Sequence, residues 1–237
     1  MLNSIQHSSK FRDKTSMIPN DDIVLIDKPA GMSSFGVVAR IRRVLSQQLG
    51  KKAKVGHTGT LDPFATGLMI LVTGKKCKEA GSFTKLDKWY QAEIILGVTS
   101  TTGDPEGELT PVSEHQPTIE EVRQAVRKFI GVIEQTPPAF SAIKIKGQRA
   151  YHLARKGQEV AMPARQITVY DIEIASYNYP KLCINTHVSS GTYIRTLAED
   201  IGNYLGTGAY CQSLRRTKIA NFIIDQAAKL SDFGIEN

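Results

Sequence analysis

A single carboxylate, Asp62, ends a long basic stretch of this sequence. No Asp or Glu occurs from Lys28 to Leu61, and seven cations fall there: Lys28, Arg40, Arg42, Arg43, Lys51, Lys52 and Lys54. Asp62 is reached through two glycines, Gly56 and Gly59, and Pro63 restricts the backbone directly after it. A carboxylate held in this way can act on a polyanion that the surrounding cations have attracted. The pattern therefore makes Asp62 a candidate catalytic residue.

A purely structural role for Asp62 is the alternative. Asp followed by Pro commonly begins a short helix, with Asp as the N-cap and Pro at the first helical position. Capping Asp residues are far commoner than catalytic ones, so spacing alone favours the cap. Further motifs are needed to decide between the two interpretations.

Length and composition indicate a globular protein with an anionic partner. The chain has 237 residues, 41% of them hydrophobic, which suits one large domain or two small ones. Its net charge is +7 and its pI is about 9.3. Cys77, Cys183 and Cys211 lie far apart, which indicates neither a zinc site nor a disulfide framework. Because no phosphate-loop, dinucleotide-binding or HExxH motif occurs, we expect no cofactor and no metal.

The sequence carries no signal for a membrane or for export. No apolar run approaches the roughly 18 residues needed to cross a bilayer. Residues 1–20 are polar and lack the hydrophobic stretch of a secretory signal, so we expect residues 1–21 to form a flexible tail. A cytoplasmic location without membrane contact is the resulting expectation.

Hydrophobic periodicity and turn residues divide the rest of the chain into strands and helices. Strands are predicted over residues 22–27, 67–73, 88–98, 166–175 and 182–188, and a loop over residues 99–107. Helices are predicted after Ser33 or Ser34, over residues 75–83, and at two capping boxes, Thr118-x-x-Glu121 and Thr196-x-x-Glu199. The first helix should bury one stripe: Phe35, Val38, Ile41, Leu45 and Leu49. Strands broken by helices without regular alternation favour an α+β domain with a large, mixed or mostly antiparallel sheet.

A second basic segment runs from Ala139 to Arg165. It contains one acid, Glu159, and two ring residues, Tyr151 and His152. Six cations surround them: Lys144, Lys146, Arg149, Arg155, Lys156 and Arg165. Cations interleaved with rings can hold backbone phosphates and stack bases. An ordinary solvated hairpin and helix is the alternative, because charged runs usually cover a solvent face.

Four segments resemble, in the same order, the motifs of the TruB family of tRNA pseudouridine synthases. The 16 residues from Lys54 to Met69 are similar to its catalytic motif without a gap. Lys88–Ala92, Gly191–Arg195 and Ser213–Thr217 are similar to its tyrosine, arginine and closing motifs. Residues 137–160 resemble its RNA-binding thumb. The resemblance spans about residues 22–218 and implies a pseudouridine-synthase-like mixed sheet flanked by helices, with a thumb insertion at about residues 137–165.

The resemblance also implies an activity, the isomerisation of uridine 55 in the tRNA T-loop to pseudouridine. Asp62 would be the nucleophile, and the permanently charged Arg195 would oppose its protonation in a closed site. Tyr90 would stack on the target base and is a candidate general base. From the residues alone, Arg195 could equally form a surface ion pair with Glu199, and Tyr90 could be a core residue of an alternating strand.

Binding residues follow from the same resemblance. Substrate contacts are assigned to His57, Tyr90, Tyr193 and Leu214, the histidine helping to extract the uridine from the folded T-loop. Tyr193 and Leu214 could otherwise be core residues. RNA contacts are assigned to Lys28 and to the thumb cations: Lys144, Lys146, Arg149, Arg155 and Lys156.

The expected organisation is a catalytic domain over residues 22–218 and a short C-terminal tail, 219–237, without a PUA domain. We expect a monomer that acts alone on the T-arm of tRNA, with no obligate protein partner. Two alternatives remain. The chain could be the catalytic subunit of a guide-RNA particle, or a noncatalytic RNA-binding or tRNA-folding protein, although pure binding needs no Asp62, Tyr90 and Arg195 constellation.

Overall fold

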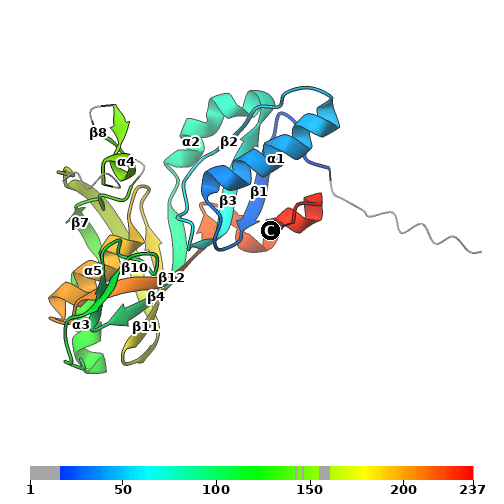
Figure 1. Ribbon diagram of the computed structural model, residues 1–237. Helices are drawn as coiled ribbons and strands as arrows, with labels where there is room; N and C mark the ends of the chain where they lie inside the picture. The colour runs from blue at the N-terminus through cyan, green and yellow to red at the C-terminus, as the bar shows by residue number, and fades with distance from the viewer. Residues whose placement is uncertain (1–16, 142, 146, 155–160, 237) are drawn as a thin grey trace, which may run out of the picture.

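The computed structural model describes residues 17–141, 143–145, 147–154 and 161–236 (Figure 1). Nine strands of this part form the main sheet: β1 Ile23–Lys28, β2 Val55–His57, β3 Thr66–Thr73, β4 Lys88–Leu96, β7 Gly131–Gln135, β10 Arg165–Asn178, β11 Lys181–Val188, β12 Ala209–Ile219 and β13 Phe222–Ile223. Two small hairpins pair β5 Val98–Ser100 with β6 Leu109–Pro111, and β8 Lys144–Ile145 with β9 Gln148–Arg149. The α-helices are α1 Ser34–Leu49, α2 Ala80–Thr84, α3 Ile119–Lys128, α4 Ala150–Ala154 and α5 Ile194–Tyr204. Three 3₁₀ helices are η1 Gly74–Glu79, η2 Ile224–Gln226 and η3 Leu230–Phe233.

The main sheet is mixed but mostly antiparallel, as predicted. Its strand order is β1-β3-β12-β4-β11-β10-β7, with β2 on β3 and β13 on β12. Among the described strands only β12 and β3 pair in parallel, where Arg216 lies beside Gly67. Gly67 has a φ of +106°, and a Cβ there would lie 2.3 Å from the main-chain oxygen of Arg216. The close crossing of these two strands therefore requires glycine.

The molecule has two halves that meet along β4 and β12 (Figure 1). Helices α1 and α2 lie with β1, β2 and β3, whereas α3 and α5 lie with β7, β10 and β11. One buried cluster runs through both halves, from Ile26 and Met69 to Ile94 and Leu197. None of the helices in the described residues is long and apolar enough to cross a membrane.

Local signals set several element boundaries as predicted. Ser33 caps α1, because its Oγ accepts a hydrogen bond from Gly36 N at 3.0 Å. The predicted box at Thr118 and Glu121 opens α3. Strand β4 buries alternate residues, among them Tyr90.

The buried stripe of α1 differs from the prediction. Phe35 is 65% exposed, and the buried positions are Ser34, Val37, Val38, Ile41 and Leu45. Ser34 faces inward because its hydroxyl exchanges two hydrogen bonds with the main chain of Leu61. With Ser34 turned inward, the adjacent Phe35 lies on the exposed side of the helix.

The predicted capping box at Thr196 does not form. Helix α5 starts earlier, at Ile194, and Tyr193 is its N-cap. The side-chain amide of Gln135 holds Tyr193 from the neighbouring strand: Tyr193 N donates to Gln135 Oε1 at 2.8 Å, and Gln135 Nε2 donates to Tyr193 O at 3.0 Å. Thr196 and Glu199 therefore lie inside the helix, and so does Arg195.

Smaller differences concern loops and the C-terminal segment. The predicted helix over residues 75–83 is η1 followed by α2, and the loop at 99–107 is flanked by β5 and β6. The segment after Lys218 is not a free tail, because Leu230, Phe233 and Ile235 are buried in the core. Of the predicted N-terminal tail, residues 1–16 lie outside the described part, and Ile18 is buried.

Candidate active site

Asp62 lies on the loop that joins β2 to β3, at a pocket of about 220 Å³. The chain enters β3 at Thr66 without forming a helix after Asp62, so the helix-cap alternative is wrong. The pocket draws its walls from this loop, from β4, from the start of α5 and from β12. Five residues predicted from the sequence line it: Asp62, Tyr90, Tyr193, Arg195 and Leu214.

Asp62 and Arg195 form an ion pair. Arg195 Nε lies 3.0 Å from Asp62 Oδ2, and the two side chains are 4% and 32% exposed, respectively. Burial raises the pKa of the Asp62 carboxyl above its ordinary value, although the charge of Arg195 acts against this shift. The cation therefore helps to keep a partly desolvated carboxylate ionised while one side of Asp62 still faces the pocket.

Three further acceptors hold the guanidinium of Arg195. Nη1 donates to Thr102 O at 2.6 Å and to Asp104 Oδ2 at 3.1 Å, and Nη2 donates to Phe140 O at 2.9 Å. Asp104 is itself fixed by the Thr102 hydroxyl, which donates to its Oδ1 at 2.6 Å. The surface-pair alternative for Arg195 is wrong, because the side chain is buried between two carboxylates.

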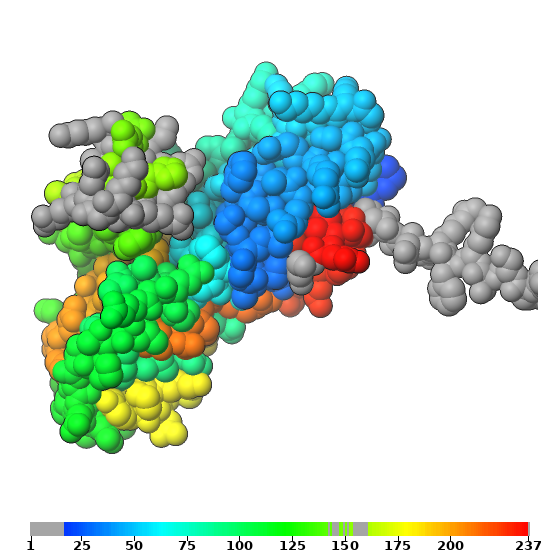
Figure 2. Space-filling view, in the orientation of Figure 1, coloured from blue at the N-terminus to red at the C-terminus, as the bar shows by residue number. Residues whose placement is uncertain are grey.

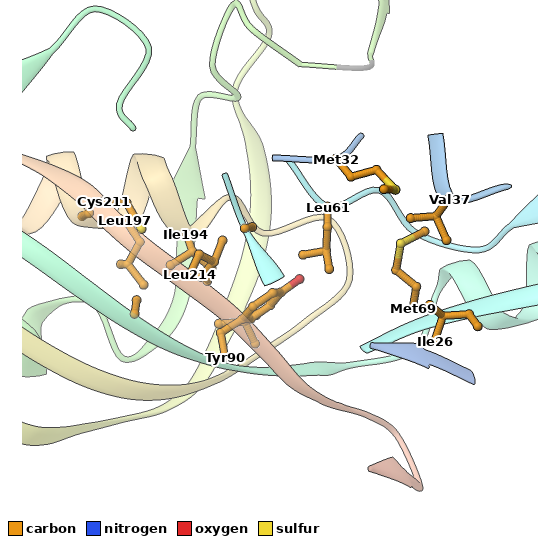
Figure 3. Packing of buried hydrophobic residues seen from close by; sticks show 14 of the residues in the cluster. Ile26, Met32, Val37, Leu61, Met69, Tyr90, Ile194, Leu197, Cys211 and Leu214 are labelled. Carbon is orange, nitrogen blue, oxygen red and sulfur yellow. The ribbon is translucent and has the colours of Figure 1, made fainter. Parts of the chain in front are cut away.

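Tyr90 and Leu214 are both core residues and pocket residues. Each is 7% exposed, belongs to the central cluster and lines the pocket. Figure 3 shows the Tyr90 ring between the Ile194 and Leu214 side chains and Leu61, the neighbour of Asp62. This packing fixes the plane of the ring at the pocket wall.

Tyr193 also lines the pocket and is half-buried. The Arg165 guanidinium carbon lies 5.1 Å from the centre of its ring, a cation–π distance. Gln135 holds the Tyr193 main chain, as described above. Tyr193 and Leu214 thus both line the pocket, and their role as walls of a base slot stays a prediction.

Two predicted contacts, Lys28 and His57, lie away from the pocket lining. Lys28 is 0% exposed, and its ammonium donates to the carbonyl oxygens of Pro29, Met32 and Pro63 at 2.8, 2.6 and 3.1 Å. A lysine enclosed in this way has no surface to offer a phosphate, so its assignment as an RNA contact is wrong. His57 pairs with Leu71 across β2 and β3 and is not among the described residues that line the pocket.

The thumb cations are only partly within the described structure. Lys146, Arg155 and Lys156 lie outside it. Lys144 and Arg149 are cross-strand partners in the hairpin of β8 and β9, which helix α4 follows. The space-filling view shows a hollow in the surface of the molecule (Figure 2). The described part of the segment with β8, β9 and α4 lies on one side of this hollow, and α1 lies on the other.

Three site residues were missed by the sequence prediction: Lys88, Asp104 and Arg216. Lys88 lines the pocket, is 6% exposed, and burial lowers its pKa to about 8. Arg216 is 1% exposed, and within the described part of the chain it donates to main-chain carbonyls alone. Lys88 and Arg216 lie within segments that match the family's motifs, and this was the only feature of the sequence that could have pointed to them. Asp104 lies in a polar loop outside these motifs, so no sequence feature pointed to it.

Comparisons with known proteins agree with this architecture. The model of the TruB family pseudouridylate synthase N-terminal domain matches residues 42–194, and that of the tRNA pseudouridylate synthase B C-terminal domain matches residues 195–234. In the crystal structure of a Cbf5-Nop10-Gar1 complex, one chain superposes with a TM-score of 0.68 at 28% identity, over 88% of this chain. This chain spans about half, 52%, of that longer chain.

Curated relatives are closer in sequence. The tRNA pseudouridine synthase B of Chloroherpeton thalassium is 44% identical over 216 residues, which are 90% of this chain and 89% of the relative. That of Phocaeicola vulgatus is 44% identical over 215 residues, 90% and 91% of the two chains. The fold is thus that of a class of pseudouridylate synthases. The chain belongs to the TruB family.

Proposed function

We propose that this protein isomerises uridine to pseudouridine in the T-loop of tRNA, with Asp62 as the group that contacts the reacting nucleoside. The main observation in support of this proposal is the Asp62–Arg195 ion pair at the edge of a nucleoside-sized pocket. Membership of the TruB family and two relatives named tRNA pseudouridine synthase B support the substrate class.

The reaction explains why this pocket needs both an ionised carboxylate and fixed apolar walls. A C–N glycosidic bond breaks, the uracil turns without leaving, and a C–C bond forms. Asp62 supplies the nucleophilic or electrostatic contact to the nucleoside, and Arg195 holds it ionised. Tyr90 and Leu214 confine the free base while it turns.

Target access requires the uridine to leave its stacked position, which costs a few kcal/mol. Binding energy from the RNA backbone offsets this cost. The basic hairpin that carries Lys144 and Arg149 is the proposed source, because phosphate contacts dominate the affinity of proteins for nucleic acids.

A stand-alone enzyme is the favoured form of this activity. The 44% identical relatives are named tRNA pseudouridine synthase B, whereas the 28% identical neighbour was solved in a Cbf5-Nop10-Gar1 complex. A guide-RNA subunit and a noncatalytic tRNA-folding protein are therefore the outcomes against which the proposal is tested.

Purified protein and an unmodified T-arm stem-loop, mixed in EDTA without guide RNA, provide the test. We expect pseudouridine at the single T-loop position, mapped by nucleotide-resolution sequencing, and none with Asp62→Asn protein. Conversion that required added RNA or protein would favour the guide particle. Tight binding without any conversion would favour the noncatalytic alternative.

A further inference from the structure

The loop that carries Asp62 has no strand partner of its own, yet each main-chain carbonyl from Gly59 to Pro63 accepts a hydrogen bond. Arg216 donates to Gly59 O at 3.2 Å and Thr60 O at 3.3 Å, and Ser34 Oγ donates to Leu61 O at 2.8 Å. Asp62 O accepts from Ala65 N at 3.2 Å, and Pro63 O accepts from Gly31 N and Lys28 Nζ. Side chains from β1, α1 and β12 therefore determine the shape of this loop.

Arg216 is unusual because it is buried without a carboxylate. It is absent from the ion pairs of the described residues, and its third donor, Nε, bonds Leu68 O at 2.7 Å. A buried guanidinium is costly to desolvate, so its three carbonyl bonds are its main compensation. One rigid fork thus ties the start of the Asp62 loop to strand β3.

Ser34 holds Leu61, the residue of the loop that follows Gly59 and Thr60. Its hydroxyl donates to Leu61 O and accepts from Leu61 N, both at 2.8 Å, so the peptide units on both sides of Leu61 are held. The Leu61 side chain is 4% exposed and is packed among Met32, Val37 and Met69 (Figure 3). Asp62 follows directly on this anchored residue.

We propose that Arg216 and Ser34 are positioning residues, which aim the Asp62 carboxylate at the nucleoside by fixing the backbone of residues 59–61. This inference rests on the proposed function. Arg216 acts through shape rather than through charge on Asp62: burial, Arg195, Asp104 and Lys28 account for the shifted pKa of Asp62, and Arg216 is not among its causes.

Neighbouring residues provide matched controls. Arg215, next to Arg216 on β12, points elsewhere and pairs with Asp27, Nη2 to Oδ2 at 2.8 Å. Ser33, next to Ser34, only caps α1. Arg215→Met and Ser33→Ala should lower the melting temperature without changing the chemical step, because neither side chain has a hydrogen bond to residues 59–61 within the described structure.

The first test measures single-turnover rate, RNA affinity, pH profile and melting temperature with the T-arm stem-loop. Arg216→Met and Arg216→Lys should each lower the rate about 100-fold, the order expected for a displacement of about 1 Å. Their affinity for RNA should match that of the wild type. The pH at which their rate falls to half its maximum on the acidic side of the pH–rate profile, here called the acid limb, should match as well. Lysine fails because it cannot reproduce the fork.

Each other result overturns the proposal. A normal rate for Arg216→Lys would mean that charge alone matters, and a loss of affinity would mean that Arg216 contacts RNA. If Arg215→Met lost as much rate as Arg216→Met and had the same melting temperature, the loss of rate would be explained by lower stability alone. Inactive wild-type protein would instead overturn the proposed function, which keeps the two failures distinguishable.

If Arg216→Met does not fold, the serine pair tests the same idea. Ser34→Ala removes the hydroxyl at Leu61 and should lower the rate roughly 10-fold, the equivalent of about one hydrogen bond. Ser33→Ala should keep the wild-type rate. Equal rates for Ser34→Ala and Ser33→Ala would overturn the inference.

Discussion

Arg195 and Arg216 approach the Asp62 loop from different elements, α5 and β12, and both are almost fully buried. Arg195 meets two carboxylates, those of Asp62 and Asp104, together with two carbonyls. Arg216 meets three carbonyls and no carboxylate within the described structure. The same side chain thus has two uses here. Beside carboxylates it opposes the rise that burial causes in the pKa of Asp62, and beside carbonyls it holds the backbone of Gly59, Thr60 and Leu68.

The comparison has meaning only if Asp62 is the reacting group. Asp62→Asn keeps the volume and removes the charge, so we expect the isomerisation rate to fall on the order of 10⁴-fold or more, as when an essential nucleophile is removed. Binding of the T-arm stem-loop should be unchanged, which a filter-binding titration checks. Appreciable turnover by the purified variant would remove Asp62 from the centre of the site.

Replacing Arg195 separates charge from shape. Arg195→Met leaves Asp62 and Asp104 without their shared cation, so we expect the rate to fall about 10²- to 10³-fold. Because Arg195 lowers a pKa that burial has already raised, its loss should move the acid limb of the rate profile to higher pH. The Arg216 variants should leave that limb in place. An unmoved limb in Arg195→Met would break the contrast between the two arginines.

Replacing Asp104 should shift the acid limb in the opposite direction to the replacement of Arg195. The negative charge of Asp104 raises the pKa of Asp62, so Asp104→Asn should move the acid limb to lower pH. The rate at neutral pH should fall about 10-fold, because Arg195 loses one of its charge-assisted partners. Rate profiles of the two variants in one buffer series provide the measurement. Shifts in the same direction would show that a common structural change, rather than charge, moves the limb.

Sequence signals succeeded where a few adjacent residues decide the structure. The cap of α1, predicted at Ser33 or Ser34 and found at Ser33, depends on neighbours within a few positions. The same holds for the box at Thr118 and the alternation around Tyr90, which were both predicted. Asp62 and Arg195 were predicted because motifs preserve the order of residues that meet in space. Short-range rules and motif order together were enough to predict which two residues form this ion pair.

The wrong predictions share a long-range cause. The orientation of α1 depends on Ser34 and Leu61, 27 residues apart. The start of α5 depends on Gln135 and Tyr193, 58 residues apart. A run of cations gives the sign of the charge but not the direction of each side chain, so the burial of Lys28 was not predictable.

RNA binding should be separable from the chemistry that the two arginines control. Replacing Lys144, Lys146 and Arg149 together by Gln should weaken RNA binding and flatten the plot of log affinity against log salt by roughly 0.7 to 0.9 per lost phosphate contact. The single-turnover rate at saturating enzyme should stay normal. Arg123, Arg127 and Lys128, exposed on α3, give a matched control of equal charge. Equal slopes for both triple variants would mean that the hairpin only solvates the surface.

Glu199 is expected to report the smallest effect, on stability rather than on rate. It lies one turn beyond Arg195 on α5, and burial raises its pKa from 4.5 to about 7. The folded protein therefore holds a proton that the unfolded chain releases, and this stabilisation is fully present below pH 4.5 and is lost as the pH rises to about 7. Glu199→Gln cannot lose that proton, so its advantage in melting temperature should grow between pH 5 and pH 8.

We expect a gain of about 2–4 °C at pH 8, or ~1 kcal/mol for a chain of this size, because solvent screens part of the charge on a half-buried side chain. Thermal melts of Glu199→Gln and wild type at both pH values give the measurement, with the exposed Glu114→Gln as the control. A difference that does not change with pH would mean that Glu199 stays ionised beside Arg195. The cation of the active site would then serve a third carboxylate, and the contrast with the carbonyl-bound Arg216 would widen.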